Sequence, residues 1–360
     1  MKLKNLFIYA SRVDLSSSSA QSKQIQCMIE EFNNQVCRFK SVNVNSSNKY
    51  SYNIPQSNSK IITLKNIIKK IFLISQNERA IVYTREIGIA SASILLRNLV
   101  FYEMHKYPKS FLVRSLISLL TKLNLLNVIF ISKGLQEACS SVVCNLDKNS
   151  IIAHDGAFET ISRRDVEEKF ELILNNVKKA GGCLFLHTGA LHKGGWDEFQ
   201  RLITTIDDND FFLHIGGTES ECATLQDISD PEKFKSLFHP AVPHEICLEL
   251  QKRADVLFYV NSKENPLYMY TSPLKIFEYM AARKPIVATD GGATREILNE
   301  ENAFLYLEDC TESLASTLTL AQDLTVIETK VHNAYQDFKT KYTWSKRVHR
   351  ILEFVIKKTT

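Results

Sequence analysis

Short apolar runs alternate with amphipathic stretches along the chain, and this alternation constrains the fold more than any other feature. The apolar runs predict buried strands, and the stretches between them predict helices that cover parallel sheets. A first series of predicted strands covers residues 5–10, 36–44, 80–84, 98–103, 128–132 and 151–153. A second series covers residues 183–188, 211–215, 236–238, 255–260, 285–288 and 303–307. The sequence therefore predicts an α/β fold with two open sheets, and the polar stretch 43–59 predicts a loop.

Length and cysteine pattern limit the class of protein. At 360 residues the chain exceeds one typical domain, so two domains are expected. The eight cysteines include no Cys-x-x-Cys pair, which favours reduced thiols in the cytoplasm over a zinc site or a disulfide framework. Near the N-terminus the unbroken apolar run 6–10 is too short for a signal peptide, and no later run has the length of a membrane span.

Charge is distributed unevenly between the two halves. Residues 1–150 hold 20 Lys or Arg against 8 Asp or Glu, a balance of +12, whereas the whole chain carries only +4. The basic half predicts an anionic partner. Within it, residues 60–73 and 111–126 predict basic amphipathic helices, whose apolar face either packs on a sheet, the favoured interpretation, or rests on an anionic bilayer. Nucleic acid is not expected, because no platform of interleaved aromatic and basic residues is present.

The segment 272–292 combines a helix with a charged pair. Ser272 is predicted to cap the helix and Pro273 to occupy its first turn. Lys275 would then lie in the first turn, where a cation is unfavourable unless an anion such as a phosphate binds at that end. Glu278 lies one turn further on the same side and could accept hydrogen bonds from a sugar diol. The segment predicts a nucleotide site, and its alternative is a helix with a Lys275–Glu278 surface pair.

The order of residues from Ser272 to Asp290 resembles the donor-binding segment of the retaining, nucleotide-sugar-dependent glycosyltransferases of family 4. That resemblance implies the GT-B fold, an α/β architecture of two Rossmann-like domains that face each other across a cleft. It implies an N-terminal acceptor-side domain over residues 1–160 and a donor-binding domain over residues 161–343. A C-terminal helix, residues 344–360, is expected to cross back onto the first domain.

The resemblance also implies site residues on the donor side, most of them in loops that directly follow predicted strands. These are Gly189, Lys193, Gly216, Gly217, Val242, Pro243, Ser272, Pro273, Leu274, Lys275, Glu278, Gly291 and Gly292. The chain departs from the family at two points. The loop with Lys193 is about two residues short and has Ala190 where an arginine is common. Tyr270 replaces the first of two acidic residues, and Glu264 is the alternative carboxylate.

On the acceptor side the resemblance implies a histidine after a strand, and His105 is that residue. The loop after the first strand has Ser18 and Ser19 where many relatives have glycines, and Arg12 precedes it as a further cation. The candidates for catalysis are His105, Glu278 and Lys193.

The expected activity is transfer of a sugar from a UDP-, GDP- or other nucleoside diphosphate sugar to an acceptor hydroxyl with retention. Neither a metal nor another cofactor is expected, because fixed lysines can stabilise the departing diphosphate. The expected acceptor is a lipid-linked or saccharide molecule of bacterial surface polysaccharide or glycolipid assembly. The expected place is the cytoplasm or the inner face of the cell membrane. The alternatives are a nucleotide-sugar epimerase of related fold and a non-catalytic subunit of a polysaccharide-assembly complex.

Overall fold

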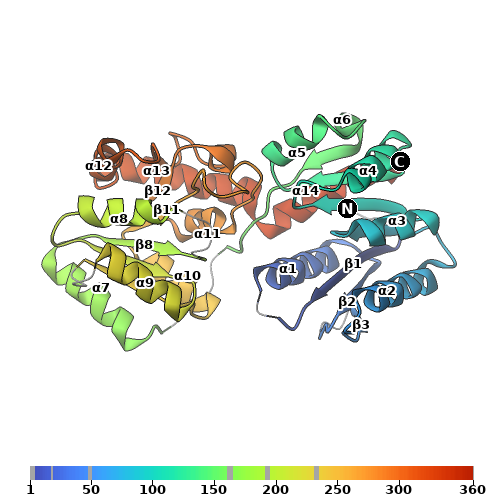
Figure 1. The fold of residues 1–360 in the computed structure, drawn as a ribbon, viewed down its shortest axis with the longest axis horizontal. Coiled ribbons are helices and arrows are strands. Elements are labelled where there is room, and N and C mark those ends of the chain that lie inside the picture. The colour runs from blue at the N-terminus through green and yellow to red at the C-terminus, as the bar shows by residue number, and fades with distance from the viewer. Residues whose placement is uncertain are drawn as a thin grey trace. The chain divides into compact units, whose positions relative to one another are not determined.

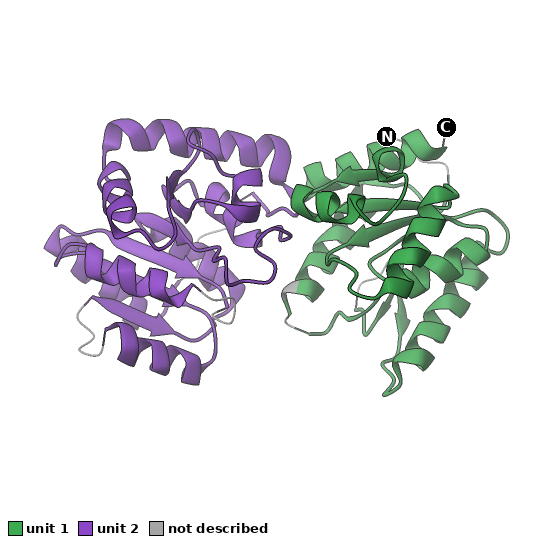
Figure 2. Cartoon of the chain, turned by 45° about the horizontal axis from the view of Figure 1, so that its top comes forward, with its two compact units in different colours: residues 1–154, 344–360 green, residues 155–343 purple. Residues whose placement is uncertain are grey.

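The computed structural model describes residues 5–17, 19–47, 51–159, 165–190, 195–230 and 235–359. The chain divides into two compact units, which Figure 2 distinguishes by colour. Unit 1 comprises residues 1–154 and 344–360, and unit 2 comprises residues 155–343. The predicted boundary near residue 160 falls on residues that lie outside the described part of the chain.

The described residues of unit 1 form a seven-stranded parallel sheet in the order β3-β2-β1-β4-β5-β6-β7. Figure 1 labels β1, β2 and β3 of this sheet. Its strands are β1 (Phe7–Asp14), β2 (Phe39–Val44), β3 (Ser51–Ile54), β4 (Ile81–Thr84), β5 (Leu99–Met104), β6 (Leu126–Phe130) and β7 (Ser150–Ile152). The prediction of a loop over residues 43–59 is wrong for β3. This strand pairs with β2 at the edge of the sheet, where only Ile54 is buried.

Three helices of unit 1 begin at serines whose side chains cap them. Ser19, Ser59 and Ser132 each accept a hydrogen bond from a backbone N–H in the first turn of the helix that follows. The helices are α1 (Ala20–Gln35), α2 (Lys60–Ser75), α3 (Ile87–Leu95), α4 (Phe111–Lys122), α5 (Lys133–Ser140), α6 (Leu146–Asn149) and α14 (Trp344–Thr359).

The C-terminal helix α14 is part of unit 1. The Gln35 side chain at the end of α1 donates to the backbone oxygen of Ser345 over 3.1 Å. Phe354 packs edge-on against Phe101 of β5, with the ring centroids 5.7 Å apart. Strand β5 and helix α14 are therefore joined through side chains that are far apart in the sequence.

The described residues of unit 2 form a six-stranded parallel sheet in the order β10-β9-β8-β11-β12-β13. Its strands are β8 (Leu184–Thr188), β9 (Phe211–Ile215), β10 (Ser236–His239), β11 (Val256–Tyr259), β12 (Ile286–Thr289) and β13 (Phe304–Tyr306). The strand order changes direction between β8 and β11, and the crevice at such a point is where open α/β sheets bind ligands.

Alternate residues of these strands build a hydrophobic core on each face of the sheet. One core is covered by α7 (Glu168–Ala180), α10 (His244–Arg253), α11 (Leu274–Ala282) and α13 (Leu324–Asp337). The other is covered by α8 (Trp196–Thr205), α9 (Glu219–Ser229) and α12 (Thr311–Leu320). A 3-10 turn, η1 (Gly292–Glu296), and a π-helical turn, η2 (Phe338–Tyr342), complete the unit.

The predicted fold class is confirmed, because both units are Rossmann-like α/β halves with parallel sheets. Every predicted strand has a counterpart within a few residues, and β9 coincides with the predicted range 211–215. Within the described residues, no helix combines the length and apolar character needed to span a membrane.

Candidate functional site

Three loops meet at the carboxyl ends of β8, β9 and β10 in unit 2. The N–H of Gly189 donates to Ile215, the N–H of Gly216 to His239, and the N–H of Ala241 to the carbonyl of Gly217, over 2.8, 2.9 and 3.2 Å. A Cβ atom on Gly216 would lie 2.0 Å from the Gly189 carbonyl oxygen, and the φ of Gly216 is +145°. Only glycine fits there. The predicted residues Gly189, Gly216 and Gly217 are therefore brought together at the ligand-binding edge of the sheet.

Helix α11 begins one residue later than predicted, and Ser272 does not cap it. Pro273 occupies the N-cap position, and no side chain caps this helix end. The Ser272 hydroxyl instead accepts a hydrogen bond of 2.7 Å from the N–H of Asp155. The prediction of a serine cap is wrong, because the acceptor is taken by a residue 117 positions away in the sequence.

Lys275 lies in the first turn of α11 and reaches the loop after β8. Its Nζ atom is 3.2 Å from Nε2 of His187 and 5.7 Å from the ring centroid of Tyr259. A Cβ atom on Gly189 would lie 2.3 Å from this Nζ. The ammonium group therefore lies directly against Gly189, at the positive end of α11, where a bound anion would offset the repulsion between the ammonium and the helix dipole.

Glu278 lies one turn further along α11 and has two partners. Its Oε1 accepts from Nε2 of His244 over 2.8 Å, and its Oε2 accepts from the Gln251 side chain over 3.3 Å. His244 opens α10 directly after Val242 and Pro243, and Pro243 is the N-cap residue of that helix. The structure thus places Val242 and Pro243, two of the predicted donor-side residues, next to a histidine that contacts the carboxylate predicted to hold a sugar diol. Sequence reasoning missed His244 and Gln251, although His244 directly follows the predicted loop residues.

The two glycines after β12 form a turn that Tyr268 covers. A Cβ atom would lie 2.1 Å from the Tyr268 hydroxyl if added to Gly291, and 2.6 Å from the Tyr268 backbone oxygen if added to Gly292. The same backbone oxygen accepts from the N–H of Ala293 over 2.8 Å. The chain continues into the five-residue 3-10 turn η1, and one of its first amides is already used by Tyr268.

The two alternatives for the altered acidic position differ in what they contact. The carboxylate of Glu264 accepts from the N–H of Gly195 over 3.5 Å, at the end of the loop that contains Lys193. Tyr270 is held in its loop by a backbone hydrogen bond to Leu267. Lys193 of that loop lies outside the described residues.

In unit 1, His105 belongs to a buried charged network. Its Nε2 contacts the carboxylate of Glu103, whose side chain is fully buried. Glu103 also contacts Arg85 over 3.0 Å, Arg347 of α14 over 2.9 Å and the Tyr83 hydroxyl. Burial opposes the ionisation of Glu103, but the two arginines and His105 outweigh it and hold the Glu103 pKa well below its usual range. The predicted His105 is therefore fixed by a carboxylate that sequence reasoning did not single out.

The other predicted acceptor-side residues are held by local partners. The backbone N–H of Arg12 donates to Glu86 over 2.6 Å, and its side chain forms an ion pair with the same carboxylate. The Ser19 hydroxyl caps α1 by accepting from Ser22. Ser18 lies outside the described residues.

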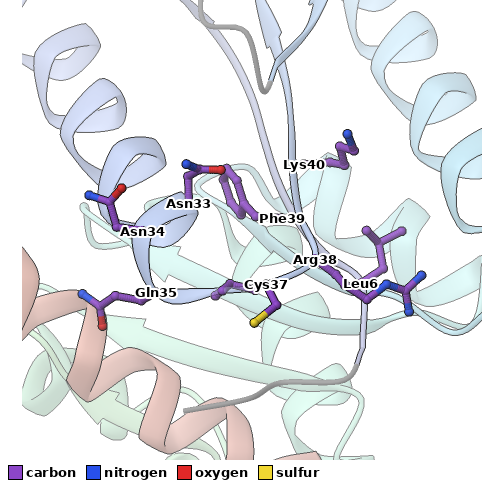
Figure 3. Close-up of a pocket in the computed structure, with 9 residues that line it drawn as sticks. Leu6, Asn33, Asn34, Gln35, Cys37, Arg38, Phe39 and Lys40 are labelled. Atoms are coloured by element: carbon purple, nitrogen blue, oxygen red, sulfur yellow. The ribbon is translucent and has the colours of Figure 1, made fainter.

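A surface pocket of about 520 Å³ lies at the amino ends of the strands in the unit 1 sheet. Figure 3 shows it between the end of α1 and the start of β2, where Arg38 and Phe39 line it. Leu6, directly before β1, also lines it. The pocket is thus at the amino ends of the strands, opposite to the edge that carries the predicted residues.

The sequence of this region matches a known family. Residues 183–323, which contain Gly189, Lys275 and Glu278, match the family described as "Glycosyl transferases group 1". The donor-side half of the chain is thus similar in sequence to group 1 glycosyltransferases. The chain is thus a transferase with the GT-B fold. A comparison with curated proteins gives no match.

Several solved structures share the fold over nearly the full chain. HepE from Anabaena, in complex with UDP and glucose, has a TM-score of 0.72 at 15% identity, over 99% of this chain and 100% of that chain. A glycosyltransferase from Rickettsia africae has a TM-score of 0.71 at 13% identity, over 99% and 100%. Sucrose-phosphate synthase from Thermosynechococcus elongatus has a TM-score of 0.65 at 14% identity, over 98% and 99%. At these identities the likeness establishes the fold.

Proposed function

We propose that the protein transfers a sugar from a nucleoside diphosphate sugar to an acceptor hydroxyl with retention of the anomeric configuration. The observation that carries the proposal is the position of Lys275 against Gly189, with Glu278 one turn further on α11. An ammonium group at a helix N-terminus suits a diphosphate, and a carboxylate at this spacing suits the ribose diol. HepE was solved with UDP and with UDP-glucose, which supports a nucleotide-sugar donor.

The chemical task is to stabilise the departing diphosphate while the anomeric carbon gains positive charge. In the proposed mechanism Lys275, the N-terminus of α11 and Lys193 provide the positive charge, so that neither a metal nor another cofactor takes part. Glu278 orients the nucleotide, and Val242 and Pro243 receive its base. His105 serves the acceptor side, held in place by Glu103.

A donor screen tests this function through release of the nucleoside diphosphate. Wild type should release it from one UDP- or GDP-sugar, and Lys275→Ala and Glu278→Ala should each lower kcat/KM by at least about tenfold, since each removes a charged contact to the donor. Lys178→Ala, an exposed change at the end of α7, should retain the wild-type rate. Equal rates for all four proteins would refute the assigned site.

The products of the same reaction separate the alternative functions. Nuclear magnetic resonance of the product should show an α-linkage from an α-linked donor, and the reaction should need an acceptor. An epimerised donor formed without an acceptor would indicate an epimerase. Binding of UDP without turnover of any donor would indicate a non-catalytic subunit. Activity that persists in excess EDTA is expected, and loss of activity that Mg²⁺ restores would contradict the metal-independent mechanism.

We further propose that unit 1 docks on an anionic membrane surface, at the cytoplasmic face where surface polysaccharide or glycolipid is assembled. Helix α4 buries Ile117 and Leu120, yet it also exposes an apolar stripe on another face. The stripe consists of Leu112, Leu116, Leu119 and Leu123, which are 77, 37, 53 and 55% exposed. Leucines three and four positions apart share one side of a helix, so they could enter a bilayer together.

The charge near this stripe favours an anionic surface. Lys109 and Lys122 flank the stripe at both ends of α4, and α2 adds exposed Lys65 and Lys69 to the same basic unit. Wild type should co-sediment at low salt with vesicles that contain phosphatidylglycerol. The variant in which Leu116 and Leu119 are both changed to Asp should not co-sediment. Leu172, a leucine of unit 2, is 60% exposed, and the control variant Leu172→Asp should still bind. If binding is the same with uncharged lipid and the same for the Leu116→Asp, Leu119→Asp double variant, the docking proposal is refuted.

A further inference from the structure

Two buried histidines lie side by side at the carboxyl ends of β8 and β9. His187 is 3% exposed and His214 is fully buried. Their rings stack with centroids 5.0 Å apart, and their Nδ1 atoms are 2.9 Å apart. Phe199 of α8 packs against both rings. Buried imidazoles are costly unless their nitrogens are hydrogen-bonded, so the partners of this pair define what it does.

The partners at both ends fix the direction of every hydrogen bond. Nε2 of His214 is 3.3 Å from the carbonyl oxygen of Gly216, which can only accept, so this nitrogen carries the proton. Nδ1 of the neutral His214 ring then accepts from Nδ1 of His187. With its proton on Nδ1, the neutral His187 ring accepts through Nε2 from the ammonium of Lys275, at 3.2 Å. One directed chain therefore joins Lys275 to the Gly216 turn.

The charge state of His214 agrees with this direction. Burial, together with the charge of Lys275, lowers the pKa of His214 to about 3, so this ring is neutral at physiological pH. A neutral imidazole can orient an ammonium group without adding negative charge next to it. A carboxylate in the same place would partly cancel the charge that an anionic ligand needs.

We propose that His187 and His214 are positioning residues of the donor site, which hold the Lys275 ammonium against Gly189 and tie it to the Gly216 turn for binding of a nucleoside diphosphate. This inference rests on the proposed function of the same site. A lysine has four flexible side-chain torsions, and fixing its ammonium before the ligand arrives removes part of the ordering cost of binding. Neither histidine touches the ligand in this account; both act through Lys275.

The test compares substitutions that differ in hydrogen bonding. His187→Leu removes the imidazole nitrogen that accepts from Lys275. In His187→Gln the amide oxygen can still accept from Lys275, and the amide nitrogen can still donate to His214. Phe199→Leu loosens the packing around both rings and leaves the hydrogen bonds, so it is the matched packing control.

Titration calorimetry with UDP and with GDP supplies the readout. Against the nucleotide that wild type binds, we expect about tenfold weaker affinity for His187→Leu, and affinities within about threefold of wild type for His187→Gln and Phe199→Leu. If wild type binds and His187→Leu binds equally well, or if Phe199→Leu is weakened as much as His187→Leu, the positioning role is refuted while the proposed function stands. If wild type binds neither nucleotide, the proposed function fails and this inference fails with it.

A second measurement needs no variant to fold. Nitrogen-15 chemical shifts of the wild-type protein should show His187 protonated at Nδ1 and His214 protonated at Nε2. The opposite tautomer at either ring, or a cationic ring near pH 7, would overturn the directed chain whatever the binding data show.

Discussion

Replacement of Arg347 by Met should destabilise unit 1 strongly, although the residue lies in the last helix of the chain. The Arg347 side chain is fully buried, contacts Glu103 over 2.9 Å and donates to the backbone oxygen of Ala153. Methionine has a similar length and preserves most of the packing, so the change mainly removes a charge from a buried network.

The contacts give the size of the effect. Removing one partner of a buried ion pair costs about 3 to 5 kcal/mol, because the other charge remains buried. Glu103 keeps Arg85 and His105 as partners, which places the expected loss near the lower end, about 3 kcal/mol. For a domain of this size that loss lowers Tm by about 6 to 12 °C.

Urea unfolding followed by tryptophan fluorescence measures this loss. The chain has two tryptophans, and on a Trp196→Phe background the remaining one, Trp344, lies buried in α14 and reports on unit 1. Arg350→Met, an exposed change in the same helix, is the control and should change the free energy of unfolding by less than about 0.5 kcal/mol. A loss below about 1 kcal/mol for Arg347→Met would show that the Glu103 network does not depend on α14.

Three further predictions concern Gly216, Ser272 and Glu103. Gly216→Ala should destabilise unit 2 by at least about 2 kcal/mol in calorimetry, because its Cβ would lie 2.0 Å from the Gly189 oxygen. The control Gly88→Ala, whose Cβ would have its nearest atom at 3.5 Å, should be neutral or stabilising, and equal effects of the two changes would contradict the close approach. Ser272→Ala should cost about 1 to 3 kcal/mol, and an unchanged midpoint would show that its buried hydrogen bond contributes nothing. The pKa of Glu103 is lower in the folded protein than in the unfolded chain. Its contribution to the free energy of unfolding is therefore present above pH 4.5 and is lost as the pH falls toward the folded pKa. The stability of wild type should thus fall more steeply with decreasing pH than that of Glu103→Gln, and identical pH profiles would contradict this.

Local patterns predicted most strands because buried parallel strands are continuous apolar runs. Strand β9 is such a run between Asp210 and Gly216, and its predicted bounds agree with the structure. Strand β3 is polar and lies at the sheet edge, so it lacked this signal.

Some contacts of the candidate site also follow from nearby sequence, whereas others join residues that are far apart in the chain. The place of Gly189 at the carboxyl end of β8 follows from the rule that site residues follow strands. The partner of Ser272 lies 117 positions away, and the contact of His187 with His214 depends on the register of two strands. A histidine inside an apolar strand was a visible signal, but its partner could be named only once β8 and β9 were paired.

The most direct measurement is a crystal structure of the wild-type protein soaked with UDP or GDP. We expect the diphosphate within hydrogen-bond distance of Lys275 Nζ, and the ribose hydroxyls on the Glu278 carboxylate in place of one of its present partners. Nucleotide density at another place on the molecule, with Lys275 and Glu278 unchanged, would contradict it.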